Sequence, residues 1–323
     1  MSLAETPLSP STLGTTLELL DQIVQQLIGT SLLITTRDSM ADTERAVGWP
    51  NVDGWSSFTD IMELSFYEED GQHKNTTSIF IIFDEASHAF VAELPGRKRN
   101  LTLEQAKSGL RRVPDHEIYP RAPADMTVFV RSPEQANNAH IKRPKLEAHS
   151  WFRDSTELAD RLLVEAQMLE LIRLHPHPNI VQYKGCVVRE GLIVGLALER
   201  HDQTLMSVVT GADGRVSRSP DRASPDRAPP DSAKIEQWLH DIESAVDHLH
   251  RLGFAHNDIN PRNIMQDGSG SMVLIDLGSC TRLGERLVEG GTPGYNEGFT
   301  RVSSKETDAI GQQQVEKWLR NSC

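Results

Sequence analysis

Apolar side chains recur along this chain at spacings that predict both helices and strands. The clearest helix is expected at 234–253, where apolar residues fall on one face of a 3.6-residue repeat. Asp231 or Ser232 can cap its start and Gly253 can end it, because glycine readily adopts the left-handed conformation after a last turn. A second amphipathic helix is expected at 17–28. The apolar face at 234–253 is formed by Ile235, Trp238, Leu239, Ile242, Ala245, Val246 and Leu249.

A β-hairpin is predicted in the first third of the chain. Residues 76–94 are rich in β-branched and aromatic side chains on both sides of a polar segment, DEAS, at 84–87. A short helix should follow, since Thr102 and Gln105 have the spacing of a capping box. The proline-rich stretch 114–125 is typical of a stiff linker.

The pattern of predicted elements and motifs divides the chain into two parts. From about residue 126 the predicted strands and helices alternate as in one continuous module, whereas residues 1–113 carry no motif with a chemical meaning. Residues 211–231 repeat SPDRA and contain almost no apolar side chains, so we expect a disordered insertion there. The prediction is therefore an N-terminal extension at 1–113 and a main domain at 126–323.

Charge and cysteine content narrow the class of protein. The formal net charge is −13, which disfavours a general nucleic-acid surface, because such a surface gathers lysine and arginine. Three widely separated cysteines, Cys186, Cys280 and Cys323, fit a reducing compartment better than a disulfide framework. The apolar run at 192–198 is too short to span a bilayer. We expect an intracellular, cytoplasmic protein that binds neither nucleic acid nor membrane; the sequence does not fix its oligomeric state.

Candidate chemistry lies at 256–265, HNDINPRNIM, where Asp258 and Asn263 stand between apolar residues. A second acid, Asp276, follows, and the intervening segment predicts a hairpin about the turn DGSG at 267–270. A hairpin brings its ends together, so these three side chains can share one site. Phosphoryl transfer needs such a set, with a carboxylate near the acceptor hydroxyl and oxygen ligands for Mg²⁺. Asp258 and Asn263 could instead merely cap a turn.

This segment resembles the protein-kinase superfamily, whose catalytic loop has the form HxDxxxxN and whose metal-binding turn is DFG. HNDINPRN is similar to the first motif, and Asp276, Leu277 and Gly278 to the second. The resemblance implies that Asp258 is the catalytic base, that Asn263 and Asp276 bind Mg²⁺, and that Gly278 lies at the nucleotide. It also implies that His256 is a packed structural residue.

Further segments match the family in the expected order. Residues 139–142, AHIK, resemble its VAIK strand, which implies that Lys142 lies over the α- and β-phosphates of ATP. The next helix would supply Glu165 as the ion-pair partner of Lys142. Taken alone, Lys142 could be an exposed lysine and Glu165 a solvated helix residue. The other matches are HPHPNIV at 175–181, LIVGLALERH at 192–201, whose Leu198 and Glu199 would lie near the adenine, and GTPGY at 291–295, which resembles the segment that receives a protein substrate.

Several positions depart from the family pattern. No glycine occurs at 126–139, so the phosphate-covering loop is altered and nucleotide binding should depend on Lys142 and the metal. Asn257 replaces the family's arginine, which disfavours control by phosphorylation of the activation loop. Asn260 replaces a lysine, and Arg262 can supply the missing positive charge, so we count Arg262 among the candidate catalytic residues.

The C-terminal part is altered as well. The family's APE segment is replaced by NEGF at 296–299, and the later helices that support peptide docking are expected to be missing. Residues 305–319 resemble the helix that anchors the catalytic loop, with either Asp308 or Glu306 as the anchoring acid. The sequence is similar to a fungal set of divergent protein-kinase-like sequences that have an added N-terminal region and a reduced small lobe.

The resemblance implies an α+β, protein-kinase-like two-lobed fold. It would comprise a small β-rich N-lobe, a truncated and mainly helical C-lobe, and an N-terminal α/β extension. The expected function is an ATP- and Mg²⁺-dependent protein kinase that acts on serine or threonine hydroxyls of a protein substrate. One alternative is a kinase-like scaffold with negligible turnover. Another is a small-molecule phosphotransferase, because HxDxxPxN with Pro261 also occurs in kinase-like enzymes for small alcohols.

Overall fold

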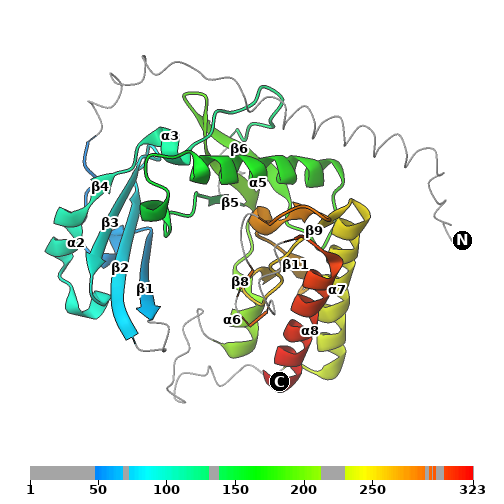
Figure 1. The fold of residues 1–323 in the computed structure, drawn as a ribbon. Helices are drawn as coiled ribbons and strands as arrows, with labels where there is room; N and C mark the ends of the chain where they lie inside the picture. Colours follow the sequence, from blue (N-terminus) through cyan, green and yellow to red (C-terminus); the bar gives the residue numbers. More distant parts are fainter. Residues whose placement is uncertain are drawn as a thin grey trace, which may run out of the picture. The chain divides into compact units, whose positions relative to one another are not determined.

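The structure is a computed structural model that describes residues 48–67, 73–130, 138–211, 230–287, 291–292, 294–295 and 302–322 (Figure 1). Residues 50–323 group into one unit. The predicted helix at 17–28, most of the insertion at 211–231 and the NEGF segment lie outside the described residues.

An antiparallel sheet forms the described part of the extension, with its strands in sequence order. The predicted hairpin is confirmed, because the second and third strands pair with Ile82 opposite Phe90. The predicted short helix is also confirmed: the Thr102 side chain accepts from the Gln105 backbone amide and the Gln105 side chain reaches back to Thr102. The strands are β1 (Asp60–Tyr67), β2 (His73–Phe83), β3 (Ala89–Pro95) and β4 (Arg111–Arg112), and the helix is α2 (Leu103–Gly109).

Both faces of this sheet are covered. On one face, Ile79, Ile81 and Val91 belong to the large hydrophobic core that continues into the rest of the chain. On the other, Phe80 packs against the ring of Trp55 in the short helix η2 (Trp55–Ser57), with 5.6 Å between ring centroids. A strand buried on both faces is expected to be continuously apolar, as the segment IFIIF in β2 is.

Residues 114–125 differ from the predicted linker. They contain a helical turn, α3 (Asp115–Ile118), that packs against α5 (Glu157–Leu174). Ile118 is fully buried, and the buried Tyr119 donates its hydroxyl to the Ser87 carbonyl at 2.5 Å. The proline content predicted a linker, but it could not indicate that long-range contacts bury this segment.

A second sheet carries the motif strands, in the order β5–β7–β6. Residues 127–129 extend its β6 edge, since the Phe129 amide donates to the Cys186 carbonyl at 2.8 Å. Gly185 permits this approach, because its φ is 126° and an added Cβ would lie 2.7 Å from the Phe129 nitrogen. The strands are β5 (Ala139–Lys142), β6 (Tyr183–Arg189) and β7 (Leu192–Glu199).

The remaining helices follow the sequence pattern. The predicted long helix is α7 (Ser232–Arg251): the Asp231 side chain caps the Lys234 amide at 2.8 Å, and Gly253 follows its end with φ 86°. It lies beside α8 (Lys305–Ser322) (Figure 1). No helix among the described residues is long and apolar enough to cross a membrane. The smaller elements are η3 (Lys98–Asn100), η4 (His149–Trp151), β8 (Gln203–Thr204), α6 (Leu205–Thr210), β9 (Phe254–Ala255), β10 (Ile264–Gln266), β11 (Met272–Leu274), η6 (Leu277–Ser279) and β12 (Thr281–Arg282).

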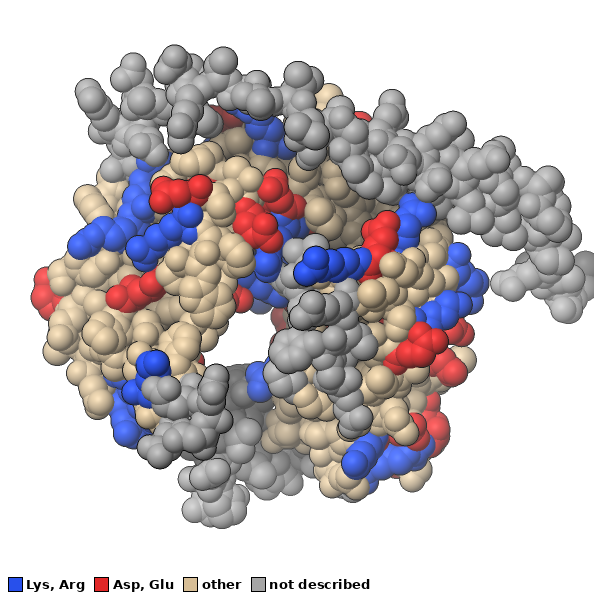
Figure 2. Space-filling view, viewed as in Figure 1, with Lys and Arg blue, Asp and Glu red and all other residues tan. Residues whose placement is uncertain are grey.

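Charged side chains of both signs lie side by side on the face shown in Figure 2. Ion pairs occur between the described residues, such as those of Arg320 with Glu236 and Glu316, each at 2.8 Å.

We expect Ile81→Ala to lower the free energy of unfolding by about 2–5 kcal/mol, because Ile81 is buried in the core that joins the extension to the main domain. Urea unfolding followed by circular dichroism and tryptophan fluorescence should show one shifted transition. The exposed Leu174 provides a control, and Leu174→Ala should change stability by less than about 0.5 kcal/mol. Two separate transitions, with only one shifted by Ile81→Ala, would contradict a shared core.

Candidate active site

The predicted hairpin is present and brings two candidate residues to its base. Strands β10 and β11 pair antiparallel with Ile264 opposite Leu274, and the Ile275 amide donates to the Asn263 carbonyl at 2.9 Å. Asp276 follows directly in the chain. Asn263 therefore precedes one strand of the hairpin and Asp276 follows the other, as the sequence predicted.

Asp258 is held from three directions. Its carboxylate accepts from the Asn263 side chain at 2.8 Å, the Asn260 side chain at 3.1 Å and the Thr292 backbone amide at 2.7 Å. An ionised carboxylate offers about four acceptor positions, so these donors leave about one for a further hydroxyl. Asn260 also donates to the Thr292 hydroxyl at 3.1 Å. The loop thus fixes the Asp258 carboxylate and leaves it able to accept a hydrogen bond from one further hydroxyl.

Lys142 and Glu165 meet as the motif implied. The Lys142 ammonium donates to the Glu165 carboxylate and, at 2.7 Å, to Oδ1 of Asp276. Only 16% of the Lys142 side chain and 8% of the Glu165 side chain are exposed. The alternatives of an exposed lysine and a solvated glutamate therefore do not apply.

Lys145 is a contact that the sequence did not indicate. It donates to Oδ2 of Asp276 at 3.0 Å, so that each oxygen of this carboxylate faces an ammonium group. The partners are 131 positions apart in the chain. The only sequence signal was the basic run KRPK at 142–145, which does not identify a partner.

The pKa values in this cluster follow from burial and charge together. Burial would raise the pKa of Asp276, but Lys142 and Lys145 outweigh it and hold that pKa well below its usual range. Burial would lower the pKa of Lys142, but Glu165 and Asp276 outweigh it and raise the pKa above its usual value. Burial raises the pKa of Glu165, an effect that Lys142 opposes. Lys142 and Asp276 consequently remain charged at neutral pH.

Gly278 packs directly beneath this cluster. A Cβ at this position would lie 3.3 Å from Oδ1 of Asp276 and 3.6 Å from Oε2 of Glu165. Asp276 itself has φ 60°, a left-handed conformation that aspartate tolerates better than most residues. A side chain at 278 would press on the Asp276 carboxylate and touch that of Glu165, so a glycine suits this position for steric reasons.

The loop at 256–263, which carries the motif of the family's catalytic loop, is anchored by Asp308 rather than Glu306. Its carboxylate is fully buried and accepts from the amides of His256 at 2.9 Å and Asn257 at 2.7 Å, with His250 Nε2 at 2.9 Å. Glu306 is exposed. One turn further along α8, an added Cβ at Gly311 would lie 2.9 Å from the backbone of Ile259, so the helix meets the loop closely there too.

Asn257 binds within the protein at the position of the family's arginine. Its buried side-chain amide donates to the carbonyls of Ala255 at 2.8 Å and Ser279 at 3.0 Å, and to the Ser303 hydroxyl at 3.1 Å. His256 is fully buried, with Nε2 3.0 Å from the Ile275 carbonyl, as expected for a packed structural residue. Both side chains tie the catalytic loop to the segments that follow it.

Two other candidate residues lie outside these contacts. Arg262 is exposed, and its guanidinium lies close enough to Tyr295 to oppose the rise in that pKa that burial causes. Glu199 is partly exposed at the end of β7, where its amide donates to the Gln182 carbonyl at 2.8 Å. The structure therefore joins Lys142, Glu165, Asp276 and Gly278 in one set of contacts, and Asp258 with Asn263 in another.

The donor set at the hairpin base suits a hard cation. Asn263 uses its amide nitrogen to bond Asp258, which leaves the amide oxygen as a possible ligand beside the carboxylate of Asp276. Among the described residues, no three His, Cys, Asp or Glu side chains form a metal cluster. Mg²⁺ commonly binds to one or two protein oxygens together with substrate phosphates, so Asn263 and Asp276 fit such a site.

Comparisons with known proteins agree with these motifs. A family model described as "Protein kinase domain" matches residues 134–297, half of the chain. Myotonin-protein kinase of Homo sapiens is 44% identical over 63 residues, covering 18% of this chain and 10% of the relative. Serine/threonine-protein kinase/endoribonuclease IRE1 of Hypocrea jecorina is 30% identical over 116 residues, covering 34% of this chain and 8% of the relative.

A solved structure of the yeast RNA Pol II CTD kinase CTDK-1 complex is similar with a TM-score of 0.41 and 17% identity, covering 50% of this chain and 51% of that one. The matched segments span a tenth or less of the length of both curated relatives.

We expect Asp308→Asn to destabilise the protein by about 1–3 kcal/mol, because an amide nitrogen would face the donors that the buried carboxylate now satisfies. Thermal unfolding would measure the loss. The matched control is Glu306→Gln, an isosteric change on the exposed side of the same helix turn, which should lower the melting temperature by much less than Asp308→Asn does. Equal effects of the two substitutions would contradict the assignment of Asp308 as the anchor.

Proposed function

The chain belongs to the protein kinase family, and from this premise we propose that it transfers the γ-phosphate of ATP to a serine or threonine hydroxyl of a protein in the presence of Mg²⁺. Its fold is the α+β, two-lobed protein-kinase-like fold. The observation that carries the proposal is the buried contact of Lys142 with both Glu165 and Asp276, together with the paired Asp258 and Asn263. The two sets are joined by the hydrogen bond from the Ile275 amide, directly before Asp276, to the Asn263 carbonyl. These are the groups that phosphoryl transfer requires for positioning and charge stabilisation.

Lys142 and Glu165 would position the nucleotide. Lys142 would bind the α- and β-phosphates, while Glu165 keeps its ammonium directed into the site. Glu199, at the end of β7, would lie near the adenine, and Gly278 would keep the space below the phosphates free of side-chain atoms. This assignment follows the family motif residue by residue.

Asn263 and Asp276 would hold Mg²⁺, which, when bound, neutralises charge on the phosphates. Asp276 is well suited, because its lowered pKa keeps the carboxylate ionised at neutral pH. Lys145 already shares this carboxylate, so a bound metal would compete with that lysine for Oδ2. The side chain of Lys145 is about half exposed and can turn toward solvent or toward a phosphate.

Asp258 would accept the proton of the attacking hydroxyl. Three donors orient its carboxylate, so the remaining acceptor position has a defined direction. Asn260 cannot supply the positive charge of the family's lysine, but the exposed Arg262 can reach toward the transferred phosphate. A serine or threonine acceptor is supported by the names of the relatives, which include serine/threonine-protein kinases.

A kinase-like scaffold with negligible turnover is the second candidate. It is favoured by Lys142 and Lys145, because they already balance the negative charge of the Asp276 carboxylate that would bind a metal. It is also favoured by the altered segment at 126–139, which lacks the family's glycines. A phosphotransferase for small molecules is the third, suggested by Pro261 in the catalytic loop.

Nucleotide binding should depend on the metal. A ligand that binds only the native state at 100 times its Kd stabilises by about 2.7 kcal/mol, so ATP with Mg²⁺ should raise the melting temperature measurably. ATP with EDTA should raise it less. In Asp276→Asn the metal-dependent part should vanish, because a neutral amide binds Mg²⁺ more weakly than a carboxylate does. An unchanged metal-dependent shift in this variant would exclude Asp276 as a ligand.

Phosphate transfer should depend on Asp258 without affecting binding. We expect Asp258→Asn to reduce turnover on a mixed protein pool by at least about 100-fold while the ATP-dependent thermal shift persists. Radiolabelled ATP would measure the transfer. Binding by the natural sequence without transfer to any acceptor would favour the scaffold, and transfer only to small alcohols would favour the third candidate.

A further inference from the structure

The extension contacts the segment that leads into α5, the helix of Glu165. Glu117 in α3 is buried, and its Oε2 lies 2.6 Å from Nε2 of His149 in η4. Its Oε1 accepts from the Asp154 backbone amide at 3.3 Å, three positions before α5 begins. One carboxylate of the extension thus ties two points of the segment immediately before α5.

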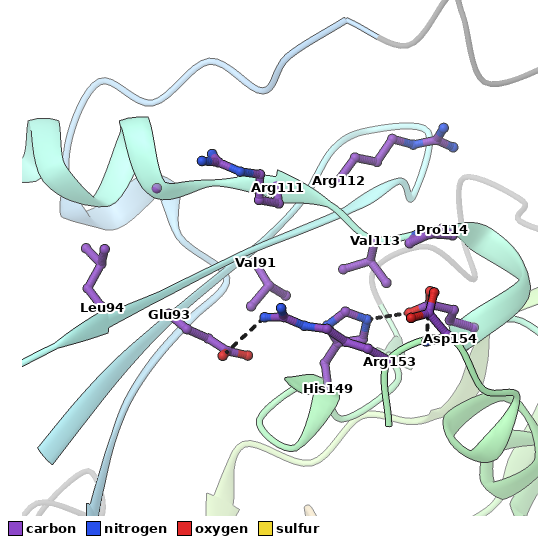
Figure 3. Close-up of a pocket in the computed structure, with 12 residues that line it drawn as sticks. Val91, Glu93, Leu94, Arg111, Arg112, Val113, Pro114, His149, Arg153 and Asp154 are labelled. Carbon is purple, nitrogen blue, oxygen red and sulfur yellow. Dashed lines mark hydrogen bonds and ion pairs between the residues drawn. The ribbon is translucent and has the colours of Figure 1, made fainter. Parts of the chain in front are cut away.

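A second contact crosses the same boundary and is weaker. A cavity of about 450 Å³ lies between the sheet and this segment. Figure 3 shows Arg153 directed at Glu93 of β3. The two side chains are 3.3 Å apart, but 59% of Arg153 is exposed, so solvent screens the pair. Glu117 and His149, which are both buried, form the stronger link.

The extension also contacts the strand that carries Lys142. The next residue, Arg143, donates to the Ser87 hydroxyl at 3.0 Å, and its guanidinium lies 4.9 Å from the ring centroid of Phe83. From β6, Arg189 donates to the Ala86 carbonyl at 2.5 Å. The turn between β2 and β3 is therefore bound to two strands of the second sheet.

Apolar packing reinforces both links. Ile81 and Ile118 of the extension share the hydrophobic core with Leu158 and Leu162 of α5. Leu162 lies one helical turn before Glu165, so a displacement of this face would move the glutamate. The two partners of the ion pair, Lys142 and Glu165, thus lie on elements that the extension contacts separately.

We propose that the N-terminal sheet, with α3, sets the relative position of Lys142 and Glu165, and that Glu117 is its main positioning residue. This inference rests on the proposed function, because the ion pair matters for transfer only if the chain binds ATP. Small displacements of positioning groups can cost a large share of catalytic power. A rigid contact on both elements would hold the pair closed without a separate partner protein.

The first test measures the structure and needs no activity. Glu117→Gln removes the charge that pairs with His149 but keeps the size of the side chain. Hydrogen exchange should become about tenfold faster or more for α5 amides near Glu165 than in the natural sequence, with no change in α7. The control is Ile82→Val, which removes one methylene from the opposite face of the same sheet and should leave exchange in α5 unchanged.

The second test separates positioning from simple loss of folded protein. Partial unfolding lowers the active fraction and hence apparent kcat, but it does not alter KM. We expect Glu117→Gln to raise KM for ATP by about fivefold or more and to leave KM for the protein acceptor unchanged, whereas Ile82→Val should alter neither. If Glu117→Gln does not fold, Arg143→Ala tests the same proposal from the β5 side and should give the same rise.

The outcomes distinguish the two hypotheses. If the natural sequence transfers no phosphate, the proposed function fails, while hydrogen exchange still decides whether Glu117 positions α5. If transfer occurs but α5 exchange and KM for ATP in Glu117→Gln and Arg143→Ala equal those of the natural sequence, the positioning proposal is overturned and the proposed function stands.

Discussion

The buried ammonium of Lys142 between two carboxylates is the interaction on which the rest of the site depends. Charges removed from water lose several kcal/mol of solvation each, which only close partners with good geometry recover. Here the three partners come from β5, α5 and the residue before η6, so the cluster exists only when all three elements are correctly placed. Loss of the Lys142–Glu165 contact would leave the buried Glu165 carboxylate without its ammonium partner. The cluster therefore makes the relative position of these elements a requirement of the folded state.

Two further buried carboxylates also hold elements of the fold in fixed relative positions. Asp308 accepts from backbone amides of the catalytic loop and contacts His250, while Glu117 accepts from the Asp154 amide and contacts His149. In each case one acidic side chain joins segments that are distant in the sequence. A carboxylate suits this role because its two oxygens can accept several hydrogen bonds from different directions. One anchor fixes the loop of Asp258 and the other the approach to the helix of Glu165.

Sequence patterns within a few residues predicted the helix caps and the hairpin of this site. They could not predict contacts between residues that are far apart in the chain. The capping box at Thr102, the Asp231 cap and the hairpin after Asn263 each depend on neighbours within a few residues, and all are present. The motifs also indicated that Lys142 and Glu165 would meet. In contrast, Lys145 reaches Asp276 across the fold, and α3 is helical because it is buried against α5, so no nearby residue identifies either contact. The choice of Asp308 over Glu306 required the rotational phase of α8, which the sequence left ambiguous.

The neutral residues at 257 and 260 alter how the catalytic loop is held. An arginine or lysine there would need an anion to balance its charge, and the position of the loop would then depend on that anion. Asn257 and Asn260 need none, because their short amides bond to acceptors that the fold already provides: carbonyls and a hydroxyl for Asn257, and Asp258 with Thr292 for Asn260. With Asp308 holding the same loop from α8, its geometry is determined by contacts within the described fold. The charged residues of the site then meet at the contact between β5 and α5, where the buried cluster fixes the relative position of the two elements.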